Sequence, residues 1–330
     1  MVTALAAESR TEKGALMLRY AIKRLLLLIP VILCTSAVVF FLMSMAPGDP
    51  AVSLLGTDAK PEALEAIREE LGLNDSLIVQ YGNYMAKLIR GDLGTSFSTR
   101  NNVFDEYMAR FPATLKLTLG GMLVVILIAV PIGILSSLKP YSLLDNCGMI
   151  AALAGISMPS YWLGLLLIVL FAQQLGWLPS GGITAQGAII LPSITLGANM
   201  AANLTRTTRS SMIEIGRQDY IRTALAKGIG KRKTITVHAL KNALIPMFTV
   251  ACVELSSMIA GACVVETVFS WPGVGRLTID AINRKDKPLA IGCLIMTAIL
   301  ISLISTMLDF IYAIVDPRIR ADIKGGKGRA

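Results

Sequence analysis

Two polar side chains stand inside one of the long apolar segments of this chain. Glu254 lies near the middle of the segment from about Leu244 to Val265, and Ser257 follows it by nearly one helical turn. If the segment spans a membrane, a carboxylate at that depth is costly and is expected to face a bundle interior or a watery cavity. The pattern predicts one of two roles: Glu254 and Ser257 line a polar pathway, or Glu254 is the structural partner of a group on a neighbouring helix.

The patterns that support enzymatic or metal chemistry are missing from the sequence. The chain has one histidine, His238, and its five cysteines form no Cys-x-x-Cys pair, so neither a zinc motif nor a redox pair is present. The phosphate-binding pattern Gly-x-x-x-x-Gly-Lys-Ser/Thr is absent as well, because residues 228–232 lack its spacing and its hydroxyl. We therefore predict a protein that is not an enzyme, with no catalytic or metal-binding residues and no cofactor of its own.

The composition indicates a membrane protein. Of the 330 residues, 54% are hydrophobic and 16% are charged, whereas soluble domains carry about 25% charged residues. The mean hydropathy is +0.64. The apolar residues are grouped in runs of roughly 20, the length that crosses a bilayer. The net charge of +9 arises mainly from segments between these runs, as membrane orientation and anionic lipids require, and this distribution argues against a nucleic-acid partner.

Six apolar runs predict an all-α membrane protein with six transmembrane helices. The runs lie at about 25–46, 115–138, 149–170, 189–204, 244–265 and 289–314. The long polar stretch 47–113, between the first two runs, contains two helix-like segments, Pro61–Leu71 and Leu77–Ile89. We predict that 47–113 forms a small extracytoplasmic helical subdomain and that 114–315 forms a five-helix membrane core.

The distribution of positive charge predicts the orientation of the chain. Both the N-terminal segment 1–24 and the tail 316–330 are basic, and the segment 206–241 between the fourth and fifth runs is the most basic of all. With both termini in the cytoplasm, 20 of the 31 lysines and arginines fall on the cytoplasmic side, in accord with the positive-inside rule. One loop, 276–287, goes against this rule.

The basic segment 206–241 contains a helix-forming stretch. Asp219 is suited to cap a helix over 219–227, and Gly228 is suited to end it in a left-handed turn. A short helix on the cytoplasmic face could dock on a partner protein and transmit its motion to the membrane spans. The residues alone also allow a basic loop that is merely solvated or touches anionic lipid.

This segment resembles a known family. The sequence Asp-Tyr-Ile-Arg-Thr-Ala-Leu-Ala-Lys-Gly at residues 219–228 is similar to the cytoplasmic loop motif of inner-membrane permeases of ATP-binding-cassette importers, in particular the dipeptide/oligopeptide/nickel family. Seven further stretches are similar in the same order along the chain: 46–50, 71–73, 157–159, 191–193, 238–246, 265–276 and 316–320. One departure is that Arg222-Thr223-Ala224 replaces the Glu-Ala-Ala of the broader importer pattern, which leaves the glutamate's ionic contact unassigned.

The resemblance implies partners and roles. It implies that a second homologous permease, in a heterodimer, completes the path through a bacterial or archaeal inner membrane. Two ATPase subunits, which bind ATP and Mg²⁺, would each receive a coupling helix, and an extracytoplasmic binding protein would deliver the solute. In this chain the coupling residues would be Asp219, Arg222, Ala224, Ala226, Lys227 and Gly228.

Several cargoes and one other class of protein remain open at this stage. The resemblance implies short peptides as cargo, with a nickel chelate or glutathione as alternatives. An ion-coupled secondary transporter or channel is the alternative from another class. For that alternative, Glu254 is the candidate carrier of a proton or ion within the membrane.

Overall fold

The computed structural model describes residues 22, 26–45, 48–56 and 58–315. Within these ranges the regular structure is helical, with one isolated β-bridge between Thr95 and Asn102. Four helices of this part are long and apolar enough to cross a membrane, namely Leu26–Met45, Val103–Leu138, Lys231–Val268 and Lys287–Leu308. The predicted all-α membrane class is therefore confirmed, whereas the count of six spans stays a prediction. The predicted N-terminal segment 1–24, apart from Ile22, and the tail 316–330 lie outside the described residues.

The chain forms two compact units, which are described separately. The bundle unit contains Leu115–Trp271 and, from the end of the described chain, residues 304–315. The insertion unit contains the described residues of Tyr20–Thr114 together with Pro272–Leu303.

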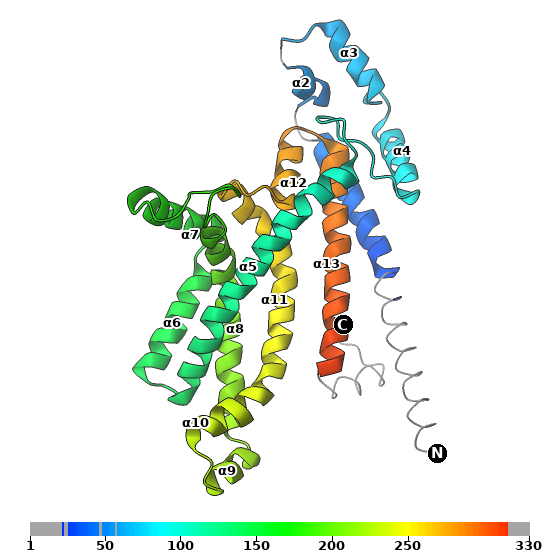
Figure 1. The fold of residues 1–330 in the computed structure, drawn as a ribbon. Helices are drawn as coiled ribbons and strands as arrows, with labels where there is room; N and C mark the ends of the chain where they lie inside the picture. The colour runs from blue at the N-terminus through cyan, green and yellow to red at the C-terminus, as the bar shows by residue number, and fades with distance from the viewer. Residues whose placement is uncertain (1–21, 23–25, 46–47, 57, 316–330) are drawn as a thin grey trace, which may run out of the picture. The chain divides into compact units, whose positions relative to one another are not determined.

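The bundle unit is built around α8. Its elements are α5 (Val103–Leu138, from residue 115), α6 (Leu143–Ser157), α7 (Ser160–Leu167), the π-helix η1 (Ile168–Gln174), α8 (Ile190–Gly216), α9 (Asp219–Ala226), α10 (Lys231–Lys233), the π-helix η2 (Thr234–Ala239) and α11 (Leu240–Val268). Helix α8 packs against α6, α7 and α11 (Figure 1). Its contact with α5 depends on glycine, because a Cβ atom on Gly197 would lie 2.8 Å from the carbonyl oxygen of Gly121.

The third predicted span is wrong as a single helix. Helix α6 ends at Ser157, Met158 is extended (φ −89°, ψ 126°), and α7 begins after Pro159. Proline lacks a backbone N–H and disfavours helical geometry in the residue before it, so the helix breaks here. With its amide oriented to donate, Asn199 on α8 bonds the freed carbonyl groups of Gly155 and Met158, and this compensates the break.

Two helices extend beyond their predicted limits. Helix α5 begins at Val103 instead of Leu115, and α8 continues to Gly216, into the predicted loop 206–241. Charged residues near these helix ends weaken the apolar pattern without ending the helix, and Pro112 lies within the addition to α5 without ending it. The apolar pattern therefore predicted the membrane-depth part of each helix and missed its extension.

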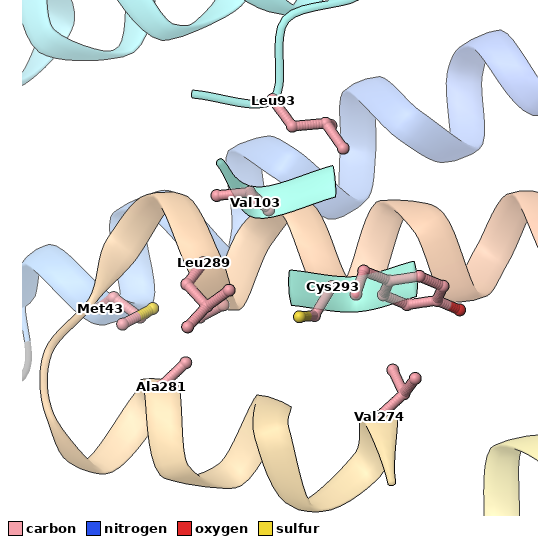
Figure 2. Close-up of a cluster of buried hydrophobic side chains, with 9 residues drawn as sticks. Met43, Leu93, Val103, Val274, Ala281, Leu289 and Cys293 are labelled. Carbon is pink, nitrogen blue, oxygen red and sulfur yellow. The ribbon is translucent and has the colours of Figure 1, made fainter. Parts of the chain in front are cut away.

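The insertion unit joins segments from both halves of the chain. It contains the helix Leu26–Met45, α2 (Pro50–Leu55), α3 (Pro61–Glu70), α4 (Leu77–Ile89), the start of α5, α12 (Val274–Asn283) and the first part of α13 (Lys287–Val315). Figure 2 shows its core, where side chains from α12 and α13 meet the first helix, α5 and the loop before α5. The core residues are Met43, Leu93, Val103, Tyr107, Val274, Ala281, Leu289, Ala290 and Cys293.

The two predicted helices of the polar stretch 47–113 are confirmed as α3 and α4. An ion pair ties α3 to the segment before α2, because both Nε and Nη2 of Arg68 donate to Asp49 Oδ2, at 2.9 and 2.6 Å. Partial burial raises the pKa of Asp49, but the bonds from Arg68 and from the Ala51 N–H outweigh it and lower the pKa below its usual value. Asp49 is therefore ionised at neutral pH, and it fixes the end of α3, where Arg68 lies, to the start of α2, which Asp49 caps.

Candidate functional site

The short helix α9 lies between α8 and the π-helix η2. Helix α8 ends at Gly216, and α9 runs from Asp219 to Ala226. The N-cap residue is Gln218, whose side chain forms no capping bond, so the prediction that Asp219 caps the helix is wrong. Asp219 is instead the first helical residue, where a carboxylate still interacts favourably with the positive end of the helix.

The predicted left-handed turn after α9 is confirmed. Gly228 has φ +81°, a value that costs glycine little and other residues more. Its N–H donates to the carbonyl oxygen of Leu225 at 3.0 Å, and the N–H of Ile229 donates to that of Ala224 at 3.2 Å. These two bonds satisfy carbonyl groups at the end of the helix and turn the chain toward α10.

Helix α9 has one face against the bundle and one face toward solvent. Ile221 and Ala224 are buried, at 5% and 8% exposure. This face packs against a surface formed by residues of α5, α8 and η2, including Leu138, Met212 and Ala239. The outward face carries the remaining predicted coupling residues, Asp219, Arg222, Ala226, Lys227 and Gly228, all of them exposed. Thus Ala224 packs against the bundle, and the other five residues are accessible to a partner.

A hydrogen bond connects α9 to the long helix α11. Asn242 Nδ2 donates to Tyr220 Oη at 3.1 Å and to the carbonyl oxygen of His238 at 2.9 Å. His238 belongs to η2, which leads directly into α11. Because π-helical turns are uncommon and often occur at functional sites, the α9–η2–α11 connection is a candidate route for motion from α9 into the bundle.

An ion pair between α6 and α8 was not found from the sequence. Arg209 Nε donates to Asp145 Oδ1 at 2.6 Å, and Arg209 Nη2 donates to Asp145 Oδ2 at 2.7 Å. The Tyr141 N–H also donates to Asp145 Oδ2, at 2.7 Å. The Asp145 side chain is 2% exposed and that of Arg209 is 21% exposed. This pair fixes the loop before α6 to the C-terminal part of α8, and the end of α8 leads into α9.

Glu254 is buried on α11 and has a partner on α8. It is 6% exposed, and Asn203 Nδ2 donates to its Oε1 at 2.6 Å. Arg206 Nη2 in turn donates to Asn203 Oδ1 at 3.2 Å. This arrangement matches the alternative in which Glu254 is the structural partner of an asparagine on a neighbouring helix.

Ser257 does not join Glu254 in one site. Its side chain is exposed, and its hydroxyl donates to the carbonyl oxygen of Val253 on the same helix at 3.1 Å. The two predicted pathway residues therefore differ in burial, and a shared polar pathway through both gains no support from their contacts. Among the described residues, no three His, Cys, Asp or Glu side chains lie close enough to hold a metal ion.

Comparison with known families identifies the chain. Residues 129–321 match the model of the binding-protein-dependent transport system inner membrane component, and residues 17–118 match the N-terminal domain model of the same transport systems. The chain belongs to this family. It is a permease subunit of an ATP-binding-cassette importer, and the alternative of an ion-coupled transporter or channel is set aside.

Named relatives cover nearly the whole permease. The dipeptide transport system permease protein DppB of Alkalihalophilus pseudofirmus is 42% identical over 92% of this chain and 100% of its own length. The glutathione transport system permease protein GsiC of Escherichia coli O6:H1 is 39% identical over 92% of this chain and 99% of its own length. Among solved structures, an inward-facing MetNI methionine transporter superposes with a TM-score of 0.55, over 64% of this chain and 96% of that one, at 19% identity. That likeness concerns the fold alone.

The partner of Glu254 leads to a prediction for transport. Replacing Glu254 by glutamine keeps an oxygen that can accept from Asn203, so uptake is expected to stay within about threefold of the unaltered permease. Replacing it by alanine leaves the Asn203 amide unpaired and is expected to cost about 1–3 kcal/mol. Solute uptake and unfolding of the purified permease measure the two effects.

The control for this comparison is Ser257→Ala on the same helix. Because Ser257 is exposed, this change is expected to alter stability by no more than about 0.5 kcal/mol. If Glu254→Gln abolished uptake while the protein stayed stable, the carboxylate charge itself would be required, and the pathway role would replace the structural one.

Proposed function

We propose that this permease forms half of a translocation path for short peptides that an extracytoplasmic binding protein delivers. The support is that relatives similar over nearly their full length are named for dipeptide and glutathione transport. Both are small peptides with free carboxylates, so one class of cargo accommodates both names. A nickel chelate is the alternative cargo within the same machinery.

The proposed topology has six spans and both termini in the cytoplasm. The four long apolar helices supply four spans. The broken segment α6–α7–η1 and the polar helix α8 would supply the other two. Helix α6 is too short to cross a membrane alone because it ends at Ser157, and α8 is less apolar than the four long helices because it carries Arg206 and Arg209. In this topology α9 lies in the cytoplasm, α2 and α3 lie outside the inner membrane, and α4 enters the membrane from that outer side.

The proposed assembly contains a second, homologous permease and two ATPase subunits. ATP and Mg²⁺ would bind to the ATPases, and their closure would move α9 and, through it, the bundle. The permease itself would supply the path and the docking helix.

The proposal that ATPase subunits dock on α9 rests on the burial pattern of this helix, which has one face packed against the bundle and one face exposed. A helix that is merely solvated has no reason to bury Ile221 and Ala224 while Tyr220 and Leu225 stay 45% and 46% exposed. Two half-exposed apolar side chains surrounded by charges have the composition of a docking surface, and the buried residues supply a rigid attachment to α5, α8 and η2.

Reversing the charges on the outward face of α9 tests the proposal. In the variant Arg222→Glu/Lys227→Glu, ATP-driven uptake is expected to fall at least about tenfold, the effect of losing about 1.4 kcal/mol of docking energy. Both side chains are exposed, so the unfolding temperature of the permease should stay unchanged. ATPase rate and uptake would be measured in nanodiscs with the binding protein and dipeptide, glutathione or nickel chelate.

The matched control is Arg232→Glu/Lys233→Glu on α10, which makes the same charge change on exposed residues outside α9. A smaller loss than in the α9 variant supports docking through α9. Equal loss in both variants would mean that basic charge in general, and not α9, attracts the ATPases. The cargo that stimulates the ATPase rate identifies the solute class independently of the docking result.

A further inference from the structure

An apolar groove runs between three helices of the insertion unit. It has a volume of about 440 Å³. Ile29 and Leu33 from the first helix, Ile295 and Ile299 from α13, and Ile89 from the end of α4 line it. Two of these three walls are helices long and apolar enough to cross a membrane, so the groove is expected to face lipid hydrocarbon.

Helix α4 lies at membrane depth beside the first helix. Tyr81 Oη is 3.1 Å from Ser36 Oγ, and Ser36 Oγ donates to the sulfur atom of Met85 at 3.6 Å. The end of α4 therefore lies beside an apolar helix that can cross a membrane. Ile89, which is 82% exposed, is expected to face lipid there, while Arg90, the next residue, is exposed and reaches the level of the headgroups.

The groove continues into a polar mouth. A second depression of about 420 Å³ shares Gly91, Leu93 and Phe104 with the groove. The mouth adds one cationic side chain, two carboxylates and one amide: Arg90, Asp92, Asp105 and Asn102. Within the described part of the chain, Arg90 takes part in none of the ion pairs. Asn102 Oδ1 accepts from the Phe104 N–H. The two N–H groups on Nδ2 of the Asn102 side chain are therefore available to a ligand.

We propose that this site binds a glycerophospholipid with a phosphoethanolamine headgroup, from the leaflet next to α4. An acyl chain fills the apolar groove, Arg90 and Asn102 bind the phosphate, and Asp92 and Asp105 bind the ammonium group. The mouth offers charges of both signs, as a zwitterionic headgroup requires, whereas an anionic headgroup without an amine would leave both carboxylates without a counter-charge. The bound lipid would hold α4, and with it α3, at a fixed depth in the membrane.

The test uses the purified importer complex in nanodiscs that contain phosphatidylethanolamine and phosphatidylglycerol. Lipids retained after detergent extraction are counted by native mass spectrometry, and a phosphatidylethanolamine with a photoreactive acyl chain reports where the chain lies. We expect cross-links to residues 29–33 and 295–299. We also expect a preference for phosphatidylethanolamine over phosphatidylglycerol of about fivefold, the scale of one exposed charge pair.

Two pairs of variants separate the groove from its mouth. Leu33→Trp fills the groove and should remove the retained lipid, whereas Leu42→Trp changes an exposed leucine of the same helix that lies outside the groove and should not. Arg90→Gln should weaken retention about tenfold, the effect of losing one charge-assisted bond, whereas Arg284→Gln, exposed outside the mouth, should not. The proposal would be overturned if Leu33→Trp and Leu42→Trp retained equal amounts of lipid, or if both lipids bound equally well. Cross-links from the groove to another subunit instead of to lipid would also overturn it.

Discussion

The variant Arg209→Ala is expected to destabilise the bundle unit by about 3–5 kcal/mol, because it leaves the buried carboxylate of Asp145 without a counter-charge. The Asp145 side chain is 2% exposed, and Arg209 supplies both of its charged hydrogen bonds. The reverse change, Asp145→Ala, is expected to cost less. Arg209 is 21% exposed, and its long side chain can turn its charged end toward water.

Unfolding of the purified permease in mixed micelles measures this asymmetry, and ATP-driven uptake measures its consequence. Arg206→Ala is the matched control, since Arg206 lies on α8 one turn earlier, is exposed and, among the described residues, bonds only the amide oxygen of Asn203. Its expected effect is below about 1 kcal/mol. If the two arginine variants lost the same free energy of unfolding, the Asp145–Arg209 pair would contribute no more to the stability of the bundle unit than an exposed arginine does.

The ion pair also has a mechanical consequence. Arg209 is on the part of α8 that leads into α9, and Asp145 holds the Tyr141 N–H in the loop before α6. In the proposed coupling, a displacement of α9 is therefore expected to reach α6 through this pair and α11 through Asn242. Loss of the pair is expected to reduce the uptake per ATP hydrolysed more than the ATPase rate itself.

The sequence predicted those features that depend on neighbouring residues. The apolar runs predicted the long helices, Pro61 marked the start of α3, and Gly228 marked the left-handed turn after α9. Each of these signals acts within one or two helical turns. The same local pattern identified Glu254 as a buried carboxylate but could not choose its role, because its partner Asn203 lies 51 residues away.

The features missed from the sequence depend on distant residues. The break between α6 and α7 is compensated by Asn199 of α8, whose side-chain amide, when oriented to donate, reaches the freed carbonyl groups. Asp145 and Arg209 are 64 residues apart, and Ser96 and Asp286 are 190 residues apart. Nothing local distinguishes these residues from the other charged and polar residues of the loops, so only the folded chain reveals which of them meet.

Replacing the buried carboxylate of Asp286 is expected to have a second large effect on stability. Asp286 is 0% exposed. Its Oδ2 accepts from Ser96 Oγ at 2.6 Å, Ser98 N at 2.9 Å and Ser98 Oγ at 2.8 Å, and its Oδ1 accepts from the Leu289 N–H at 3.3 Å. It therefore joins the loop before α5 to the start of α13. Asp286→Ala leaves these donors unpaired and is expected to destabilise the insertion unit by about 3–5 kcal/mol.

Two comparisons make this prediction specific to the bonds of Asp286. Asp286→Asn retains one oxygen acceptor and is expected to fall between the unaltered protein and the alanine variant. Asp280→Ala, on α12, removes a half-exposed carboxylate whose ion pair with Arg276 is a long contact of 3.8 Å, and it should cost less than about 0.5 kcal/mol. Limited proteolysis of residues 90–102 would locate the loss. Protection of this loop in Asp286→Ala equal to that in Asp280→Ala would mean that the apolar core around Val103 and Leu289, and not the carboxylate, holds the loop in place.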